Sequence, residues 1–419
     1  MAVRDMQPWQ DFLLRARWFQ GKGLPIDGIE WHALPWQARD GDVWVRSELA
    51  EVRSGAGQPP DVYHLLVGYL PCGHGEPDAL IGRVELPGRG WADAVDAPHS
   101  PTAMQALLRG ITEPGCAGVE WLDQVPDPCA ETRVFAGEQS NTTVQVGDSV
   151  LFKIFRKLSP GPSLESESLA ALAHCDITPG LIGTWATTDG AYQLGLFSQR
   201  ISDAEDGWGW CVGACRDGRD ISAEMSGLGA TLRRLHTEFA AVFGTSTIDA
   251  ATIGQQMLGR LDAAVAQVPE LAECQTPLRA VLGLPSSQVE VQRVHGDFHL
   301  GQALISPRGW TIIDFEGEPL KTPAERAAHD TVWRDVAGLL RSLDYARSHH
   351  RDPAGEDAVG WYRAARAAFL DGYLASVVEP PSILTAYEVD KAIYELVYET
   401  RNRPTWSWIP RQAIIEAIG

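Results

Sequence analysis

The first part of the chain alternates apolar and polar positions over short stretches that are separated by turn residues. Successive side chains of a strand point to opposite faces, so a period of two predicts strands with one buried face. This pattern predicts an antiparallel sheet in residues 1–90, with strands at 28–36, 42–54, 61–70 and 79–86. A Pro- and Gly-rich passage follows, and it predicts a connection with one helix at 104–110. We therefore expect a domain boundary near residue 90.

The alternation returns in residues 131–158, where Gly147 and Asp148 separate two apolar runs. A turn between two alternating runs predicts a β-hairpin. After the hairpin, Ser163 is a candidate N-cap for a helix that contains Glu165 and Glu167. We assign residues 91–200 to a small lobe.

Beyond residue 200 the apolar residues recur at intervals of three and four, which is the pattern of helices with one buried face. The clearest helical stretches are 221–243, 252–268, 331–349 and 387–403. Residues 201–419 are therefore expected to form a mostly helical large lobe. Strands and helices segregate along the chain, so the expected fold class is α+β.

Charge and cysteine usage narrow the function classes. The net charge of −20 and the pI near 4.9 argue against nucleic acid or anionic membrane surfaces as partners, because both require basic patches. The seven cysteines are scattered, and the Cys211–Cys215 pair has no second pair to complete a structural zinc site. The start of the chain has no signal-peptide pattern and no apolar run is long enough to span a membrane, so we expect a cytoplasmic protein. Nothing in the sequence requires an oligomer.

Residues 293–319 carry the strongest chemical signal, because Asp297, Gln302 and Asp314 interrupt two short apolar runs. Oxygen ligands of this kind suit Mg²⁺, and a further carboxylate can act as a base. Phosphoryl transfer requires a metal ion and a cation at the phosphates and a carboxylate at the acceptor hydroxyl. Lys153, on one face of the second hairpin strand, can supply the cation.

Residues 294–305 (VHGDFHLGQALI) and 312–319 (IIDFEGEP) resemble the catalytic and metal-binding loops of the aminoglycoside-phosphotransferase-like kinases. The segments RARWFQGKG, GEQSNTTV, DGWGW, RDVAGLLRSLDYA and YETRNRPTW extend the resemblance to the actinobacterial maltokinase-like and glucosamine kinase branch. The resemblance implies a bilobal, eukaryotic-protein-kinase-like fold with a β-rich N-terminal cap. It also implies that ATP and Mg²⁺ are used with a small sugar.

The resemblance assigns roles by motif position. Asp297 is expected to be the catalytic base, and Gln302 and Asp314 are expected to hold Mg²⁺. Lys153 would hold the phosphates of ATP, paired with Glu165 or Glu167, of which we prefer Glu167. The remaining residues expected to bind the nucleotide are Ser140, Asn141 and Thr142 over the phosphates, and Gln199 and Ile201 near the adenine.

The sequence constrains the identity of the acceptor sugar less than it constrains the type of reaction. We favour glucosamine, giving glucosamine 6-phosphate, over maltose, because bulky tryptophans shorten the expected pocket and carboxylates can pair with an ammonium group. The candidate acceptor residues are His299, Arg341, Asp344, Glu395, Tyr398, Glu399, Trp406 and Trp408. If the segment is extended, the two tryptophans share a face. The alternative for Arg341 and Asp344 is an ordinary ion pair within a helix.

Two readings from other classes remain open. A kinase-like scaffold without catalysis would have no need for the base, both metal ligands and the lysine, all of which are present. An antibiotic-modifying phosphotransferase would share the catalytic loop, but it would leave the cap unexplained.

Overall fold

The computed structural model describes residues 7–23, 25–54, 59–135, 140–318, 321–375 and 381–418. The chain divides into two compact units. The first unit is Met1–Ala170 with Pro179–Ser202, and the second is Ala171–Thr178 with Asp203–Gly419. Among the described helices, none is both long enough and apolar enough to cross a membrane.

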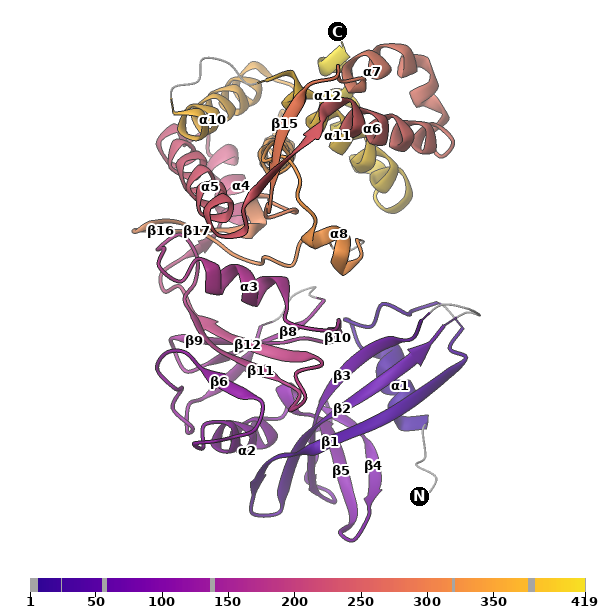
Figure 1. The fold of residues 1–419 in the computed structure, drawn as a ribbon, viewed down its shortest axis with the longest axis vertical. Helices are drawn as coiled ribbons and strands as arrows, with labels where there is room; N and C mark the ends of the chain where they lie inside the picture. The colour runs from indigo at the N-terminus through magenta and orange to yellow at the C-terminus, as the bar shows by residue number, and fades with distance from the viewer. Residues whose placement is uncertain are drawn as a thin grey trace. The chain divides into compact units, whose positions relative to one another are not determined.

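The cap is an antiparallel sheet that packs against one short helix (Figure 1). Its strands lie in the order β1-β2-β3-β5-β4, and they are β1 (Gly28–Asp40), β2 (Val43–Arg53), β3 (Asp61–Pro71), β4 (Leu80–Leu86) and β5 (Gly90–Asp96). Helix α1 (Gln7–Arg15) contributes Trp9, Phe12 and Leu13 to the core beneath the sheet. The four predicted strands are confirmed.

Strand β5 corrects one expectation, because residues 90–96 were assigned to an irregular connection. The segment pairs with both β3 and β4, so the cap sheet runs past residue 90. Gly88 and Gly90, both with positive φ, form the turn into this strand. The following helix, α2 (Pro101–Ile111), is the predicted one, and Ser100 caps it by accepting from the Ala103 amide.

The small lobe has a second antiparallel sheet in the same unit, with strand order β6-β11-β12-β9-β8-β7. The predicted hairpin is confirmed, because β8 and β9 pair around the Gly147 turn. Ser163 caps helix α3 (Leu164–Ala171) through the Ser166 amide, as expected. The other strands are β6 (Val119–Trp121), β7 (Thr132–Val134), β8 (Thr142–Val146), β9 (Val150–Ile154), β11 (Leu181–Ala186) and β12 (Gln193–Gln199).

A buried arginine fastens the cap to the small lobe. Arg156 follows β9 and donates through Nη2 to both carboxylate oxygens of Asp96 at 2.9–3.0 Å. Its side chain is fully buried and also lies over the Trp18 ring. Strand β10 (Lys157–Leu158) then pairs with cap strand β3. Burying an ion pair costs desolvation energy, so this seam depends on both partners being present.

His64 on β3 completes the seam. Its Nδ1 donates to Phe155 O at 3.0 Å, and its Nε2 accepts from Ser47 Oγ at 2.8 Å. Burial, reinforced by the Arg156 charge, lowers the pKa of His64 to about 3. The imidazole is therefore neutral in the folded protein.

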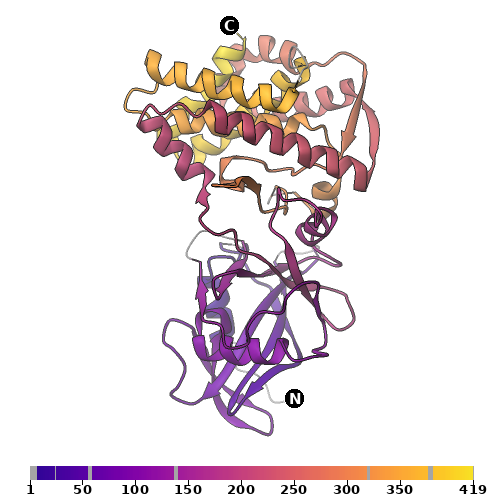
Figure 2. The same cartoon turned by 90° about the vertical axis from the view of Figure 1, so that its left-hand side faces the viewer.

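The second unit is mostly helical, and it has two small strand groups, β13-β16-β17 and β14-β15 (Figures 1 and 2). Helices α5, α9 and α11 confirm the helical predictions at residues 221–243, 331–349 and 387–403, and α6 confirms the one at 252–268. The helices are α4 (Gly207–Arg216), α5 (Ser222–Phe243), α6 (Ala250–Val265), η2 (Pro269–Cys274), α7 (Gln275–Leu282), η3 (Leu300–Gln302), α8 (Pro323–Ala327), α9 (Trp333–Arg347), α10 (Glu356–Leu374), α11 (Ser382–Asn402), η4 (Pro404–Trp406) and α12 (Trp408–Ile418). The short strands are β13 (Glu205–Asp206), β14 (Thr245–Asp249), β15 (Gln288–Gln292), β16 (Ala303–Ser306) and β17 (Gly309–Ile312).

Helices α5 and α10 approach closely because glycines line their contact. A Cβ atom at Gly372 would overlap Ser226 O, and one at Gly229 would overlap Phe369 O. By contrast, Gly360 on the same helix α10 faces open space. The close helix contact thus requires a glycine at position 372 of α10 but not at position 360.

We predict that Gly372→Ala lowers the free energy of unfolding by about 1–3 kcal/mol, because the helices must separate to accept the methyl group. Gly360→Ala is the matched control, and it should raise stability by up to about 1 kcal/mol, since alanine restricts the unfolded chain. Thermal melts of the two variants beside the parent test this. Equal melting temperatures for the two variants would contradict the packing described.

The neutral state of His64 predicts acid sensitivity. An unfolded histidine binds a proton below pH 6.5, whereas His64 stays neutral down to about pH 3 in the folded state, so stability falls as the pH falls between these values. His64→Gln should reduce the stability lost between pH 7 and pH 5 by about 2 kcal/mol, measured by urea denaturation. His32→Gln is the control, since His32 is 45% exposed on the same sheet. An unchanged pH dependence in His64→Gln would be evidence against a neutral buried imidazole.

Candidate active site

The loop after β15 is held by a buried carboxylate. Asp335, in the first turn of α9, is fully buried and accepts the backbone amides of His295 at 2.7 Å and of Gly296 at 2.8 Å. It also accepts from His236 Nε2 at 3.0 Å. Burial opposes its ionisation, but the bonds from His236 and Gly296 hold the pKa of Asp335 below its ordinary value. The charged carboxylate thus fixes the backbone just before Asp297.

His295 braces the loop from the other side. Its Nε2 lies 3.0 Å from Ile313 O, and its Nδ1 lies 3.4 Å from the Asp297 amide. The ring also packs against Phe298 and Phe315. His295 therefore ties the loop that carries Asp297 to the segment that carries Asp314.

Asp297 faces a cation from a distant part of the sequence. Lys391 on α11 places its Nζ 3.9 Å from Asp297 Oδ1. Both side chains are partly exposed, at 33% for Lys391 and 25% for Asp297. The carboxylate is thus accessible to a substrate hydroxyl while it has a positive neighbour.

His299 caps the short helix η3 rather than standing free. Its Nδ1 accepts from the Gly301 amide at 3.1 Å. Burial lowers the pKa of His299 below its ordinary value, against the opposing effect of Asp297. The Nδ1 of this predicted acceptor residue is thus engaged in capping.

Gln302 and Asp314 lie together, as predicted. Gln302 Nε2 donates to Asp314 Oδ2 at 3.1 Å. Asp314 has φ of +64°, a left-handed conformation that costs energy for any residue but glycine. Backbone strain of this kind clusters at active sites and ligand-binding sites. The pair offers amide and carboxylate oxygens, so the donor chemistry fits Mg²⁺.

In the first unit, Lys153 is paired with a glutamate of α3, as predicted, but that glutamate is Glu165 and not Glu167. Alternate residues of β9 are buried, and Lys153 lies on the opposite face, where its Nζ is 2.7 Å from Glu165 Oε2. The preference for Glu167 as its partner is thus corrected in favour of Glu165. The reason is the register of α3, which buries Glu165 in its first turn and leaves Glu167 half-buried.

The side chains expected over the phosphates are partly committed to structure. Asn141 Oδ1 accepts from the Arg156 amide at 3.0 Å, and Thr142 Oγ1 accepts from Arg156 Nε at 2.8 Å. Ser140 is exposed, and residues 136–139 of the same turn lie outside the described residues. At the end of β12, the Gln199 side chain is exposed, and its backbone amide donates to Gly180 O. Ile201 is half-buried.

The predicted acceptor residues on α9 and α11 form a buried charge network. Arg341 donates to Asp344 Oδ2 at 2.7 Å and to Glu395 Oε2 at 2.9 Å. Arg347 also binds Asp344, through its Oδ1. Burial raises the pKa of Glu395 against the effect of Arg341. The intrahelical ion pair of Arg341 and Asp344 therefore exists, and it extends to a second helix.

The third acidic position continues this network toward the aromatic residues. Glu399 is buried and binds Arg403 Nε at 2.9 Å, and Tyr345 Oη donates to it at 3.2 Å. The Arg403 guanidinium lies over the Trp406 ring, with 4.9 Å to its centroid. Tyr398 is 45% exposed on another side of α11.

Trp406 and Trp408 are not on an extended segment, so the condition for their sharing the face of a strand is not met. Pro404 starts the helix η4, and Trp408 starts α12. Both tryptophans nevertheless line one cavity of about 200 Å³, together with Ser348, His349, Thr405 and Ile409. The cavity is thus built by a tight helical turn rather than by a strand.

Comparisons with known proteins agree with this description. The family described as "Phosphotransferase enzyme family" matches residues 131–375, and the one described as "Maltokinase N-terminal cap domain" matches residues 12–99. The chain belongs to the phosphotransferase enzyme family. As a member of it, the chain carries the predicted α+β fold with a β-rich N-terminal cap.

Similar phosphotransferases are known from actinobacteria. A glucosamine kinase of Streptacidiphilus jiangxiensis is 29% identical over 380 residues, covering 80% of this chain and 83% of the relative. One from Mycolicibacterium smegmatis is 25% identical over 382 residues, covering 81% and 93%. Among solved structures, a glucosamine kinase in complex with glucosamine, ADP and inorganic phosphate superposes with a TM-score of 0.69. It is 22% identical and covers 98% of this chain and 99% of that one, which shows that the fold is shared.

Two residues of this phosphotransferase were missed by the sequence analysis. Asp335 sits at a core-facing position of an otherwise apolar helical face, where a carboxylate is unusual enough to serve as a signal. Lys391 precedes Glu395 and Glu399 at intervals of four, so the three share one face of α11. Only the fold shows that this face includes a neighbour of Asp297.

We predict that Asp335→Asn lowers the rate of phosphotransfer at least about tenfold and reduces stability by about 1–3 kcal/mol. The new amide would present donors where the loop amides need an acceptor. Turnover assays and thermal melts measure the two effects. Asp357→Asn is the control, because Asp357 is exposed in the first turn of α10. If the two variants behaved alike, Asp335 would not hold the loop.

Proposed function

We propose that the protein is an ATP- and Mg²⁺-dependent sugar kinase that phosphorylates glucosamine, giving glucosamine 6-phosphate. The observation that carries this proposal is the loop in which Asp297 is fixed by Asp335 and His295, with Gln302 and Asp314 paired beside it. Phosphoryl transfer requires little covalent chemistry from the protein, so fixed charges and positioned groups account for most of the catalysis. The glucosamine kinases similar over most of the chain support the choice of acceptor.

Asp297 is the proposed base. A carboxylate in reach of the acceptor hydroxyl orients the oxygen and takes its proton as the bond to phosphorus forms. The backbone bonds to Asp335 and His295 restrict the motion of Asp297, so little reorganisation is needed during the reaction. The Lys391 cation offsets the charge that the carboxylate brings near the phosphates.

Gln302 and Asp314 are the proposed ligands of Mg²⁺, which, when bound, neutralises charge on the phosphate oxygens. The side-chain amide supplies a neutral oxygen, and the strained backbone of Asp314 aims the carboxylate. In the first unit, Lys153 is the proposed phosphate ligand, and Glu165 holds its ammonium in place. We propose that Ser140, Asn141 and Thr142 cover the phosphates chiefly through backbone groups, because Arg156 occupies oxygens of two of these side chains. Gln199 and Ile201 remain the proposed neighbours of the adenine.

The face of α11 is the proposed acceptor surface. Lys391, Glu395 and Glu399 repeat every four residues along it, from the neighbour of Asp297 to the contacts of Arg403. Glu395 is the carboxylate of this face that we propose for the ammonium group of glucosamine, because Glu399 is buried and bound to Arg403. The cavity of about 200 Å³ beside Trp406 and Trp408 is the proposed place where aromatic rings would pack against the sugar.

We also propose the division into a cap (1–90), a small lobe (91–200) and a large lobe (201–419), with the strand β5 extending the cap sheet to Asp96. The match of the cap family to residues 12–99 supports a cap of this kind. A location in the cytoplasm remains a prediction from the sequence.

The deciding experiment measures Mg²⁺-dependent release of ADP from ATP with glucosamine, glucose, maltose and an aminoglycoside as acceptors. We predict the highest kcat/KM with glucosamine. Asp297→Asn should lose about 10²–10⁴-fold in kcat while it still binds ATP, and Asp357→Asn should remain active. Preference for maltose would contradict glucosamine as the acceptor, but it would still support a sugar kinase. ATP binding without turnover of any acceptor would favour the scaffold.

A further inference from the structure

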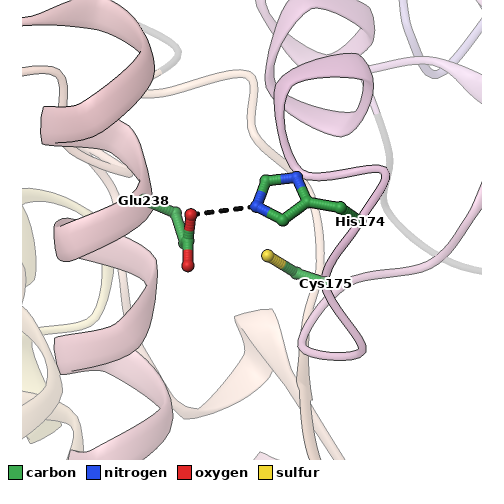
Figure 3. A group of neighbouring side chains, drawn as sticks. All are labelled: His174, Cys175 and Glu238. Atoms are coloured by element: carbon green, nitrogen blue, oxygen red, sulfur yellow. Dashed lines mark hydrogen bonds and ion pairs between the residues drawn. The ribbon is translucent and has the colours of Figure 1, made fainter.

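Three side chains of the second unit gather at a place to which the kinase chemistry gives no role. His174 and Cys175 lie on the loop that precedes Ile177, and Glu238 lies on helix α5. Figure 3 shows the imidazole and the thiol of the loop both pointing toward the carboxylate on the helix. Their ligand atoms all lie within 4.8 Å of one another.

Two of the three ligand atoms lie at nearly the spacing found in a metal site. His174 Nε2 and Glu238 Oε2 are 3.0 Å apart. Metal bonds of about 2.0–2.1 Å at a tetrahedral angle place nitrogen and oxygen ligands about 3.3 Å apart, so a zinc ion requires only a small shift of these atoms. The turn is fixed by the Cys175 amide, which donates to Leu172 O at 2.8 Å. The loop therefore presents adjacent ligands from a defined backbone.

The chemical type of the ligands selects the metal. A thiolate together with an imidazole favours Zn²⁺ over the hard ion Mg²⁺, which prefers oxygen alone. The cation nearest in sequence on the helix, Arg234, is already paired with Asp176 at 2.5 Å. His174 is 60% exposed and Glu238 is 27% exposed, so an ion can enter from solvent.

We propose that His174, Cys175 and Glu238 form a zinc-binding site that fastens the loop to helix α5. Three protein ligands would leave one position of a tetrahedral zinc ion for water. The thiol proton of Cys175 passes to solvent as the sulfur–zinc bond forms.

The site would act on structure near the proposed catalytic loop. Ile177 O, two residues after Cys175, accepts the Ile312 amide at 2.8 Å at the end of β17. Asp314 follows two residues later. Zinc would thus restrain a loop that is hydrogen-bonded to the strand leading to a proposed Mg²⁺ ligand, and it would stabilise the folded state by binding to it alone.

The experiment is a titration of the tag-free, metal-free full-length protein with ZnCl₂, followed by calorimetry and by thermal melts. We expect one zinc per chain and a higher melting temperature. Co²⁺ in place of zinc should give the thiolate-to-cobalt charge-transfer absorption, which is independent of kinase activity. Absence of stoichiometric binding, or of the thiolate band, overturns the proposal.

Variants identify the ligands. Cys175→Ser should abolish the thiolate band and weaken zinc binding by at least about tenfold, whereas Cys274→Ser, at another partly buried free cysteine, should change neither. Misfolding could also weaken zinc binding in Cys175→Ser, so a second variant is needed. His174→Gln changes a largely exposed side chain that can be replaced without disturbing the core, and it should weaken zinc binding as well. Zinc affinity that survives both Cys175→Ser and His174→Gln places the ion elsewhere and overturns the site. The two proposals are tested separately. Failure to release ADP would not affect the zinc site, and zinc binding would not affect the kinase proposal.

Discussion

The buried carboxylate of Asp335 is the interaction on which the candidate site depends. It satisfies two backbone amides of the loop before Asp297 and one imidazole from helix α5. A backbone turn in this position would otherwise leave buried donors unpaired, at a cost of about 1–3 kcal/mol each. The positions of Asp297, the proposed base, and of the strand that leads to Asp314 both follow from this one group, because His295 links the two segments.

Buried ion pairs hold structural elements together in both units. Helices α9 and α11 are joined by Arg341 between Asp344 and Glu395, and the same face of α11 offers Lys391 to Asp297. In the first unit, Arg156 and Asp96 join the cap to the small lobe in the same manner. Paired buried charges contribute little net stability, but losing one partner is costly, so such pairs specify one arrangement of the elements. The proposed acceptor surface is thus as rigid as the network behind it.

The corrections to the sequence analysis share one cause, which is that local pattern does not report three-dimensional neighbours. Strand β5 has a glycine start and few large apolar residues, and its two flanking strands make it a strand. The choice between Glu165 and Glu167 depended on a helix phase that only packing sets. Trp406 and Trp408 meet at one cavity through a helical turn begun by Pro404, and not through the face of an extended segment that the sequence analysis considered.

The sequence by itself determined the fold class, the cap strands β1–β4, the β8–β9 hairpin, the long helices α5, α6, α9 and α11, and the pairing of Gln302 with Asp314, because these rest on periodicity and on short-range spacing of chemical groups. Only the tertiary structure decided which distant residues serve that group. Asp335 lies 40 positions from His295, Glu238 lies 64 positions from His174, and Lys391 lies 94 positions from Asp297. Such contacts carry no local signal, since they arise when apolar faces pack and bring the polar side chains with them.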